Sequence, residues 1–272
     1  MRVSPCSGCS DSLVERSGER TVGALLAPSA RCRVGARQRR GAVHTGCMLT
    51  LFQFELSPYC DKVRRVLRYK AVPFEVVEVS LFDARRQSPT GKLPALLDGD
   101  KRIDDSTRIA RYVEDKHPEP ALIPADPAQR ARCHVLEDWA DESLYFYDIA
   151  AHFSLRDNAL PRIDAMTVDE SPARRWMLRR LMPTLMRHVA FVQGTGRRAG
   201  RRLLEQLGWH MEAIEAWLDP GPWLLGGELS LADIAVSCQL DAIRATPEGR
   251  ALVDGRAIVV DWQRRVRAMT GG

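Results

Sequence analysis

Hydrophobic and polar positions from Met48 to His117 repeat with two different periods. An apolar run from Leu49 to Phe54 is followed by an amphipathic segment from Pro58 to Lys70, and then by alternating apolar and acidic residues from Phe74 to Val79. Short apolar or alternating runs predict strands, whereas apolar positions three or four residues apart predict a helix. These three elements are therefore predicted to form a β-α-β unit.

A hairpin is predicted after a short irregular or helical piece at residues 81–87. Asp98-Gly99-Asp100 separates two short strands, Ala95 to Leu97 and Lys101 to Ile103, and an Asp-Gly pair in this position is a strong hairpin signal. Ser106 to Lys116 then shows one apolar face and is predicted to be a helix. The predicted order of this part is β-α-β-α-β-β-α.

Four prolines mark a boundary after this helix, at positions 118, 120, 124 and 127. Proline cannot continue a helix, so residues 118–127 are predicted to be a linker between a domain at 48–117 and a second domain at 128–272. The second domain is helical almost throughout, with predicted helices at Ala128 to His152, Ser171 to Gln193, Arg201 to Leu218, Leu231 to Ala245 and Ala257 to Met269.

The segment Ser230 to Asp233 has the pattern of a helix start. Ser230 fits the N-cap, and Asp233 lies three residues later, where its carboxylate can reach back to the cap. Leu229 and Ile234 take the two positions of a hydrophobic staple. We interpret this box as folding chemistry rather than as part of an active site.

Charge is distributed unevenly between the first 47 residues and the rest. The first 47 residues contain eight arginines, three acidic residues and four cysteines, and the chain from Met48 onward has equal numbers of basic and acidic residues. The folded part thus offers no net basic field, and we expect no nucleic-acid partner. Residues 1–47 are predicted to be a disordered tail; an organelle transit peptide, a metal or redox arm, and sequence ahead of a start at Met48 all stay open as its origin.

Cysteine usage and hydropathy indicate a cytoplasmic protein. The cysteines after Met48 are Cys60, Cys133 and Cys238, an odd number that does not suggest a disulfide framework. Cys6 and Cys9 form a C-x-x-C pair, but no second pair follows at zinc-site spacing, so we expect no metal. No apolar run approaches the roughly 20 residues that cross a bilayer, and we expect no membrane partner.

The tetrapeptide Ser57-Pro58-Tyr59-Cys60 is the strongest candidate for chemistry. Ser57 suits the N-cap of the predicted helix, and Pro58 suits its first turn, where the missing N–H costs nothing. The positive end of a helix favours an anion such as a thiolate. Cys60 falls on the stripe that faces the core, so Ser57 is interpreted as the functional group and Cys60 as a packed thiol.

Two further segments resemble the soluble glutathione transferase superfamily: Gly91 to Asp98 (GKLPALLD) and Ile103 to Tyr112 (IDDSTRIARY). The resemblance extends from Met48 to the C-terminus and includes the box at Ser230. It implies a thioredoxin-like α/β N-terminal domain, an all-α C-terminal domain, and glutathione as co-substrate with a small electrophile. It also implies a homodimer.

The same resemblance implies roles for residues of both segments. Pro94 is expected to be cis, and the backbone of Leu93 is expected to pair with the cysteinyl unit of glutathione. Lys92 lies where some classes place a lysine near the tripeptide, and Asp105 and Ser106 match an acidic-Ser pair that holds the γ-glutamyl group. Arg85 and Arg86 are candidates for the glycine carboxylate, and part of the second pocket is expected at Tyr145, Phe146 and Tyr147.

Ser57 stands where glutaredoxins have the first cysteine of Cys-Pro-Tyr-Cys. A hydroxyl cannot form a mixed disulfide, but it can donate a hydrogen bond to the sulfur of glutathione and favour the thiolate. We therefore expect a glutathione transferase in which Ser57 activates the thiol. Two alternatives are a thiol-disulfide or deglutathionylating enzyme that uses Cys60, and a non-catalytic binding protein of the same fold.

Overall fold

The computed structural model describes residues 48–80, 83–154, 158–192 and 199–272. The prediction for residues 1–47 lies outside this range. The first half contains β1 (Leu49–Gln53), α1 (Pro58–Tyr69), β2 (Phe74–Glu78), α2 (Ala84–Gln87), β3 (Ala95–Asp98), β4 (Lys101–Asp104) and α3 (Ser106–Lys116). This is the predicted order, and strands β3 and β4 are each one residue longer than predicted.

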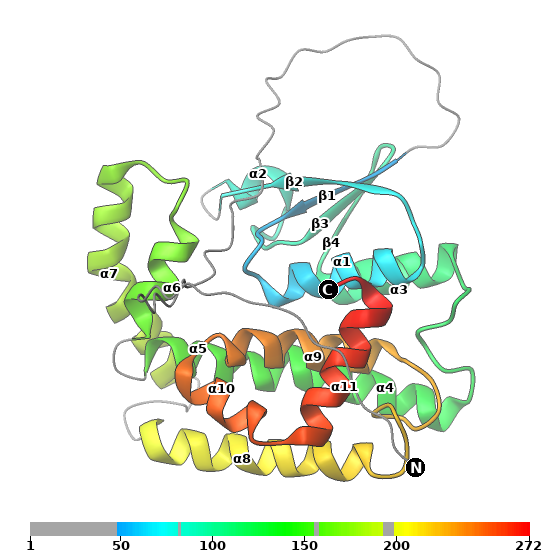
Figure 1. The fold of residues 1–272 in the computed structure, drawn as a ribbon. Helices are drawn as coiled ribbons and strands as arrows, with labels where there is room; N and C mark the ends of the chain where they lie inside the picture. Colours follow the sequence, from blue (N-terminus) through cyan, green and yellow to red (C-terminus); the bar gives the residue numbers. More distant parts are fainter. Residues whose placement is uncertain (1–47, 81–82, 155–157, 193–198) are drawn as a thin grey trace, which may run out of the picture. The chain divides into compact units, whose positions relative to one another are not determined.

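These strands form a mixed four-stranded sheet in the order β2-β1-β3-β4. Strand β1 runs parallel to β2, with Leu51 beside Val76, and antiparallel to β3, with Leu51 beside Leu96. The turn between β3 and β4 uses Gly99 at a φ of 58°, a left-handed conformation that glycine adopts without steric cost. Helices α1 and α3 lie on the face of the sheet that is directed toward the helical part of the chain (Figure 1).

The second half is built from helices alone. They are α4 (Pro127–Asp138), the π-helical turn η1 (Trp139–Leu144), α5 (Tyr145–Phe153), α6 (Ala159–Met166), α7 (Pro172–Ala190), α8 (Ala199–Leu218), α9 (Leu231–Arg244), α10 (Pro247–Asp254) and α11 (Ala257–Thr270). The thioredoxin-like sheet with a helical second half is the expected fold class. None of the described helices is both long and apolar enough to pass through a bilayer.

One helix prediction needs correction, and two short helices were missed. The segment predicted as one helix from Ala128 to His152 is divided by η1, because no capping residue or proline in the sequence marks this π turn. Helices α6 and α10 were not predicted, since each has only eight residues and a short apolar stripe. The predicted helix from Ser171 to Gln193 is confirmed as α7, although Pro183 lies in its interior, where proline is normally unfavourable.

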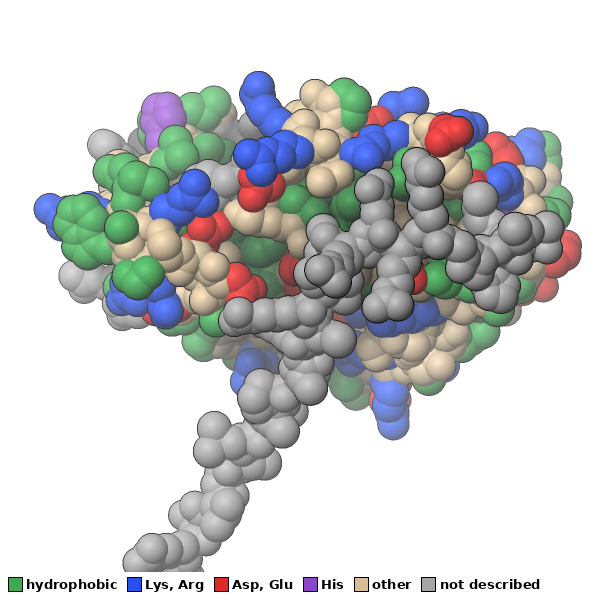
Figure 2. Space-filling model, turned by 90° about the horizontal axis from the view of Figure 1, so that it is seen from above, with side chains coloured by type: hydrophobic (Ala, Val, Ile, Leu, Met, Phe, Trp, Pro, Cys, Tyr) green, Lys and Arg blue, Asp and Glu red, His purple; other side chains and the backbone are tan. Residues whose placement is uncertain are grey.

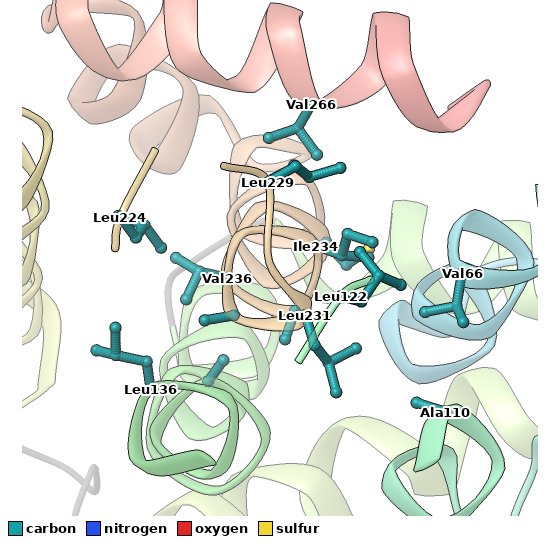
Figure 3. Close-up of a cluster of buried hydrophobic side chains, with 14 of the residues drawn as sticks. Val66, Ala110, Leu122, Leu136, Leu224, Leu229, Leu231, Ile234, Val236 and Val266 are labelled. Carbon is teal, nitrogen blue, oxygen red and sulfur yellow. The ribbon is translucent and has the colours of Figure 1, made fainter. Parts of the chain in front are cut away.

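Helix α9 is the centre of the core (Figure 3). Apolar side chains from both halves of the chain surround it, among them Val66 of α1, Leu136 of α4 and Val266 of α11. The linker joins this core as well, because the N–H of Leu231 donates to the carbonyl oxygen of Leu122 at 2.8 Å. One hydrophobic cluster therefore includes residues of the sheet, α1, α3, α4, η1 and α8 to α11, whereas α5, α6 and α7 contribute to a second cluster.

The predicted box at the start of α9 is confirmed. The carboxylate of Asp233 is fully buried and accepts four hydrogen bonds, two from Ser230 and one each from the N–H of Leu224 and the indole of Trp262. The box thus connects the start of α9 to the preceding loop and to α11.

Candidate functional site

A cleft of about 1020 Å³ lies between the loops that follow β1 and precede β3, the starts of α1 and α3, and helices α4 to α7. Its lining includes six of the residues singled out from the sequence: Ser57, Lys92, Leu93, Pro94, Asp105 and Ser106. Figure 2 shows a hollow on this face, with acidic side chains at its edge and apolar side chains gathered toward the α6–α7 end. One end of the cleft is therefore polar and the other apolar.

Ser57 occupies the N-cap position of α1, as predicted. Its backbone is extended, with φ −82° and ψ 123°, and its Oγ accepts a hydrogen bond from the N–H of Cys60 at 3.4 Å. A hydroxyl that accepts from the helix keeps its own proton for another partner. The half-buried Ser57 side chain borders the cleft, so this proton can be directed to a ligand beside the positive end of α1.

Cys60 lies inside the core rather than in the cleft. Its side chain has no exposed surface, and its Sγ accepts from the N–H of Phe54 at 3.4 Å. Burial raises the pKa of the Cys60 thiol to about 11, although hydrogen bonds from Phe54 and Ser57 act in the opposite direction. The thiol is thus neutral near pH 7, and the prediction of a packed cysteine is confirmed.

The loop before β3 contributes the next part of the wall. The Leu93–Pro94 peptide bond is cis, as the resemblance implied. Leu93 is half-buried, Pro94 is buried and Lys92 is exposed. Arg85 and Arg86 are not among the residues that line the cleft, and Arg86 pairs with Asp83 at 3.0 Å. Of the described cations in this segment, Lys92 is the one at the cleft wall.

Asp105 has a structural task at the start of α3. Its φ is 72°, which is unusual for a residue with a side chain, and its Oδ1 accepts from the N–H groups of Thr107 and Arg108 at 3.0 and 3.1 Å. Ser106, the first residue of the helix, is buried but borders the cleft. The positive end of α3 therefore faces the cleft, with one Asp105 oxygen already used as its cap.

A buried charged cluster lies behind this wall, and sequence analysis did not find it. The Lys62 ammonium is 1% exposed and contacts Glu137 at 2.7 Å, together with the carboxylate of Asp141 and, at 3.4 Å, the hydroxyl of Thr107. Burial acts against the charged lysine, but the two carboxylates hold the pKa of Lys62 above its usual value. Burial also raises the pKa of Asp141, and Lys62 opposes this only in part.

This cluster joins the two halves of the chain at the floor of the cleft. Lys62 and Thr107 belong to α1 and α3, whereas Glu137 and Asp141 belong to α4 and η1. The backbone carbonyl of Asp141 also accepts from the Tyr59 hydroxyl at 2.6 Å. The spacing of Glu137 and Asp141, four residues apart on one helical face, was the available signal, but it did not indicate their partner.

The other end of the cleft is mainly apolar. Its lining includes Leu56, Ile149, Phe153, Met166, Met182 and Met186. Tyr145 also lines it, with its ring 5.1 Å from that of Tyr59, but Phe146 and Tyr147 do not. Tyr147 instead packs against His210, with ring centroids 4.9 Å apart. One of the three aromatic residues expected here thus belongs to the cleft.

Asp148 is the one buried acid at the apolar end among the described residues that line the cleft. Its side chain is 2% exposed, and its Oδ1 lies 3.3 Å from Nε2 of His152. The same Nε2 lies 3.2 Å from the carbonyl oxygen of Ala242, which can only accept. Over the described part of the chain, no group of His, Cys, Asp and Glu side chains is arranged to hold a metal ion.

Two family models match the chain. The glutathione S-transferase N-terminal domain matches residues 51–121, and the glutathione S-transferase C-terminal domain matches residues 197–265. The two matches together include about half of the chain, and each falls on one of the two halves described above.

Several characterised proteins are similar in sequence. Glutathione S-transferase Z2 of Arabidopsis thaliana is 38% identical over 90 residues, which cover 30% of this chain and 40% of that protein. The chain thus spans about two fifths of this relative. FtsZ-localized protein A of Caulobacter vibrioides is 28% identical over 202 residues, 71% of this chain and 76% of the relative. The isoprene-epoxide glutathione S-transferase of Rhodococcus sp. strain AD45 is 26% identical over 222 residues, 78% and 92% of the two chains.

Solved structures share the fold. A glutathione S-transferase III in its apo form has a TM-score of 0.58 and 26% identity, over 81% of this chain and 92% of that chain. A glutathione S-transferase from Rhodospirillum rubrum F11 has a TM-score of 0.60 and 24% identity, over 81% and 88%.

Proposed function

The chain belongs to the glutathione S-transferase superfamily, and on this premise we propose that its cleft binds glutathione and transfers it to a small electrophile. The observation that supports this most directly is the position of Ser57, a helix cap whose hydroxyl borders the cleft at the positive end of α1. In this proposal glutathione is the co-substrate and its thiolate is the nucleophile.

The polar end of the cleft is suited to the tripeptide. We assign the cysteinyl unit to the backbone of Leu93, beside the cis bond to Pro94, and the γ-glutamyl carboxylate to Ser106 at the positive end of α3. Asp105, exposed next to Ser106, takes the ammonium group of the same unit. Lys92 is assigned to the glycine carboxylate, since Arg85 and Arg86 lie outside the lining.

The energy required of Ser57 is modest. Lowering a thiol pKa by two units takes about 2.7 kcal/mol. A hydrogen bond to a charged group supplies about 1.5–3 kcal/mol, and the positive end of a helix adds about 0.3–1 kcal/mol. One hydroxyl at the start of α1 is therefore sufficient. Binding both substrates in one cleft also makes their encounter effectively unimolecular.

The second substrate is placed at the apolar end. One relative is named for the transfer of glutathione to isoprene epoxide, so epoxides are the first class of electrophile that we propose to test. Attack of the thiolate on an epoxide carbon forms the carbon–sulfur bond, breaks the carbon–oxygen bond, and leaves an alkoxide that takes a proton from water.

The test is the ultraviolet thiolate absorbance of bound glutathione as a function of pH. In the wild type the apparent thiol pKa should lie well below that of free glutathione. In Ser57→Ala it should rise by about one to two units, which corresponds to roughly 1.4–2.7 kcal/mol.

Ser171→Ala is the matched control. Ser171 caps α7 in the same way, with Pro172 after it and an N–H donor at 3.4 Å, but it does not line the cleft. Its variant loses a cap without losing a cleft hydroxyl, so the thiol pKa should stay at the wild-type value. An unchanged thiol pKa in Ser57→Ala would show that Ser57 is only a helix cap.

Two other functions are less well supported. A disulfide-exchange role for Cys60 needs an accessible thiolate, whereas burial holds this thiol neutral and away from the cleft. A binding protein without catalysis has one supporting observation, because a similar protein is named for its localisation with FtsZ rather than for a transferase activity. Binding of glutathione without turnover of any electrophile would favour that function.

We further propose that the protein acts as a homodimer in the cytoplasm, without nucleic-acid partners. The homodimer and the cytoplasmic location come from the resemblance and the cysteine usage, and the absence of nucleic acid comes from the balanced charge after Met48. The domain bounds at 48–117, 118–127 and 128–272 are proposed on the same basis. In support, α3 ends at Lys116 and α4 begins at Pro127.

A further inference from the structure

The apolar end of the cleft contains a carboxylate that the proposed transfer reaction does not use. Asp148 lies on α5 with 2% of its surface exposed, and its neighbours along the wall are Ile149, Phe153, Met182 and Met186. An aspartate is seldom buried among such side chains unless another group compensates its charge.

None of the described residues donates a hydrogen bond to one oxygen of this carboxylate. Asp148 Oδ1 is buried, and no hydrogen bond reaches it from any described residue. His152 is close, at 3.3 Å, but its Nε2 also lies 3.2 Å from the carbonyl oxygen of Ala242. Since a carbonyl oxygen only accepts, the N–H of His152 is directed to α9 and away from Asp148.

We propose that Asp148 is a specificity-determining residue, which selects a second substrate whose apolar body carries a cationic or hydrogen-bond-donating group. The selected group has the chemistry of an ammonium or a hydroxyl. The inference rests on the proposed function, because it places this substrate beside bound glutathione. An ionised carboxylate only accepts hydrogen bonds, so a donor from the substrate completes its coordination, whereas a substrate carboxylate is repelled.

Arg162 is a cation that would instead favour a substrate with an anionic group. It lines the same region but is half-exposed, and its Nη2 donates to the carbonyl oxygen of Leu56 at 3.1 Å. Water screens its charge more than that of the buried Asp148. The Asp148 carboxylate therefore determines the preference.

The experiment measures the affinity of a matched series of glutathione S-conjugates by calorimetry. The series contains S-benzylglutathione and its derivatives with an aminomethyl, a hydroxymethyl or a carboxyl group at the meta or para position, and S-methylglutathione reports on the tripeptide alone. In the wild type the aminomethyl conjugate should bind at least about tenfold more tightly than S-benzylglutathione, and the carboxyl conjugate should bind most weakly.

Asp148→Asn should remove the preference for the aminomethyl conjugate and leave the affinity for S-methylglutathione unchanged. Glu142→Gln is the matched control, because this acid also lines the cleft but is exposed, and its variant should keep the preference. Asp148→Ser replaces the asparagine variant if the latter does not fold. Equal binding of all conjugates by the wild type, a preference for the carboxyl conjugate, or a preference that persists without Asp148 would each overturn the proposal.

Failure of the transferase proposal would give a different result. If S-methylglutathione does not bind, the apolar end is probed alone with 4-methylbenzylammonium and 4-methylbenzyl alcohol, by saturation-transfer NMR. Binding of the ammonium that depends on Asp148 would support the selectivity and contradict only the glutathione site. No binding of either probe would overturn the selectivity as well.

Discussion

Ser57 and Cys60 lie one helical turn apart, and their surroundings give them opposite chemistry. The hydroxyl borders the cleft, whereas the thiol is fully buried and accepts a hydrogen bond from the N–H of Phe54. The hydrogen bond between Ser57 Oγ and the N–H of Cys60 orients both residues. The short motif therefore places a polar hydrogen-bond donor at the surface and an inert sulfur below it.

The buried thiol has a measurable effect on stability at alkaline pH. The pKa of Cys60 rises from 9.0 to about 11 because of burial. The folded state keeps this proton between these two values while the unfolded state loses it, so the stabilisation is complete below pH 9 and declines as the pH rises toward 11. The full loss corresponds to about 2.7 kcal/mol.

Urea unfolding at pH 8 and pH 10 measures this loss. For the wild type, Cys60 should contribute a decrease of about 1 kcal/mol between these two conditions. Cys60→Ala should be less stable at both pH values but should show a smaller decrease. Cys133→Ala offers a second test of the same kind, because burial also raises the pKa of the Cys133 thiol to about 11. The same decrease in the wild type and in Cys60→Ala would contradict the buried neutral thiol.

The signal of a helix cap located Ser57, and the resemblance of two segments to the transferase superfamily located Pro94, Asp105 and Ser106. They were not enough for Lys62. The carboxylate partners of Lys62 are 75 and 79 residues away in the sequence. Sequence alone predicts that a lysine near the start of a helix is exposed to solvent. Asp148 was missed for a similar reason, since the burial of an acid depends on helices that are distant in sequence.

At the scale of single elements, the start of α9 is the best understood. Ser230→Ala removes one donor to Asp233 and should cost about 1 kcal/mol, up to about 2 kcal/mol, of unfolding free energy. Asp233→Ala should cost several kcal/mol, because it leaves the N–H groups of Leu224, Ser230 and Trp262 unpaired, at about 1–3 kcal/mol each. Chemical denaturation of both variants measures these values.

Glutathione affinity is the control for this prediction. Neither Ser230 nor Asp233 lines the cleft, so the Ser230→Ala variant, as long as it is folded, should bind S-methylglutathione as the wild type does. A cost of less than about 0.3 kcal/mol for Ser230→Ala, which is below the usual range for a cap, would show that the box is not a stabilising feature.

Element boundaries followed from the sequence where a cap or a proline marked them, as at α1, α3 and α9. The π turn η1 has no such mark. One extra residue in a helix rotates all later side chains by about 100°. The residues after η1, Tyr145 and Asp148 among them, therefore take directions that a single straight helix would not give them.

At the scale of the whole molecule, the two halves share one hydrophobic core. Leu51 of the sheet and Val66 of α1 belong to the same buried cluster as Ile234 and Trp262 of the helical half. Polar contacts add to this, because Arg65 of α1 pairs with Asp241 of α9 at 2.7 Å. We therefore predict that residues 48–272 unfold in a single cooperative transition.

Hydrogen exchange of wild type and Trp262→Ala tests this prediction. Trp262 is fully buried in α11, and its loss should cost about 3–5 kcal/mol. The exchange of the amides in β1 and β3 should become faster by the same factor as that in α9, although the substitution lies outside the sheet. Acceleration confined to the helical half, or two separate melting transitions, would contradict a shared core.

The position of α1 has a consequence for biosynthesis. This helix, which begins beside Ser57, packs against α9 and α11, and the guanidinium of Arg68 donates to the carbonyl oxygen of Gly271 at 2.6 Å (Figure 1). A ribosome adds roughly 5–20 residues per second, so the last partners of α1 emerge roughly 8–30 s after the sheet is complete. During this interval the side of α1 that packs against α9 and α11 is exposed to solvent and can contact other chains.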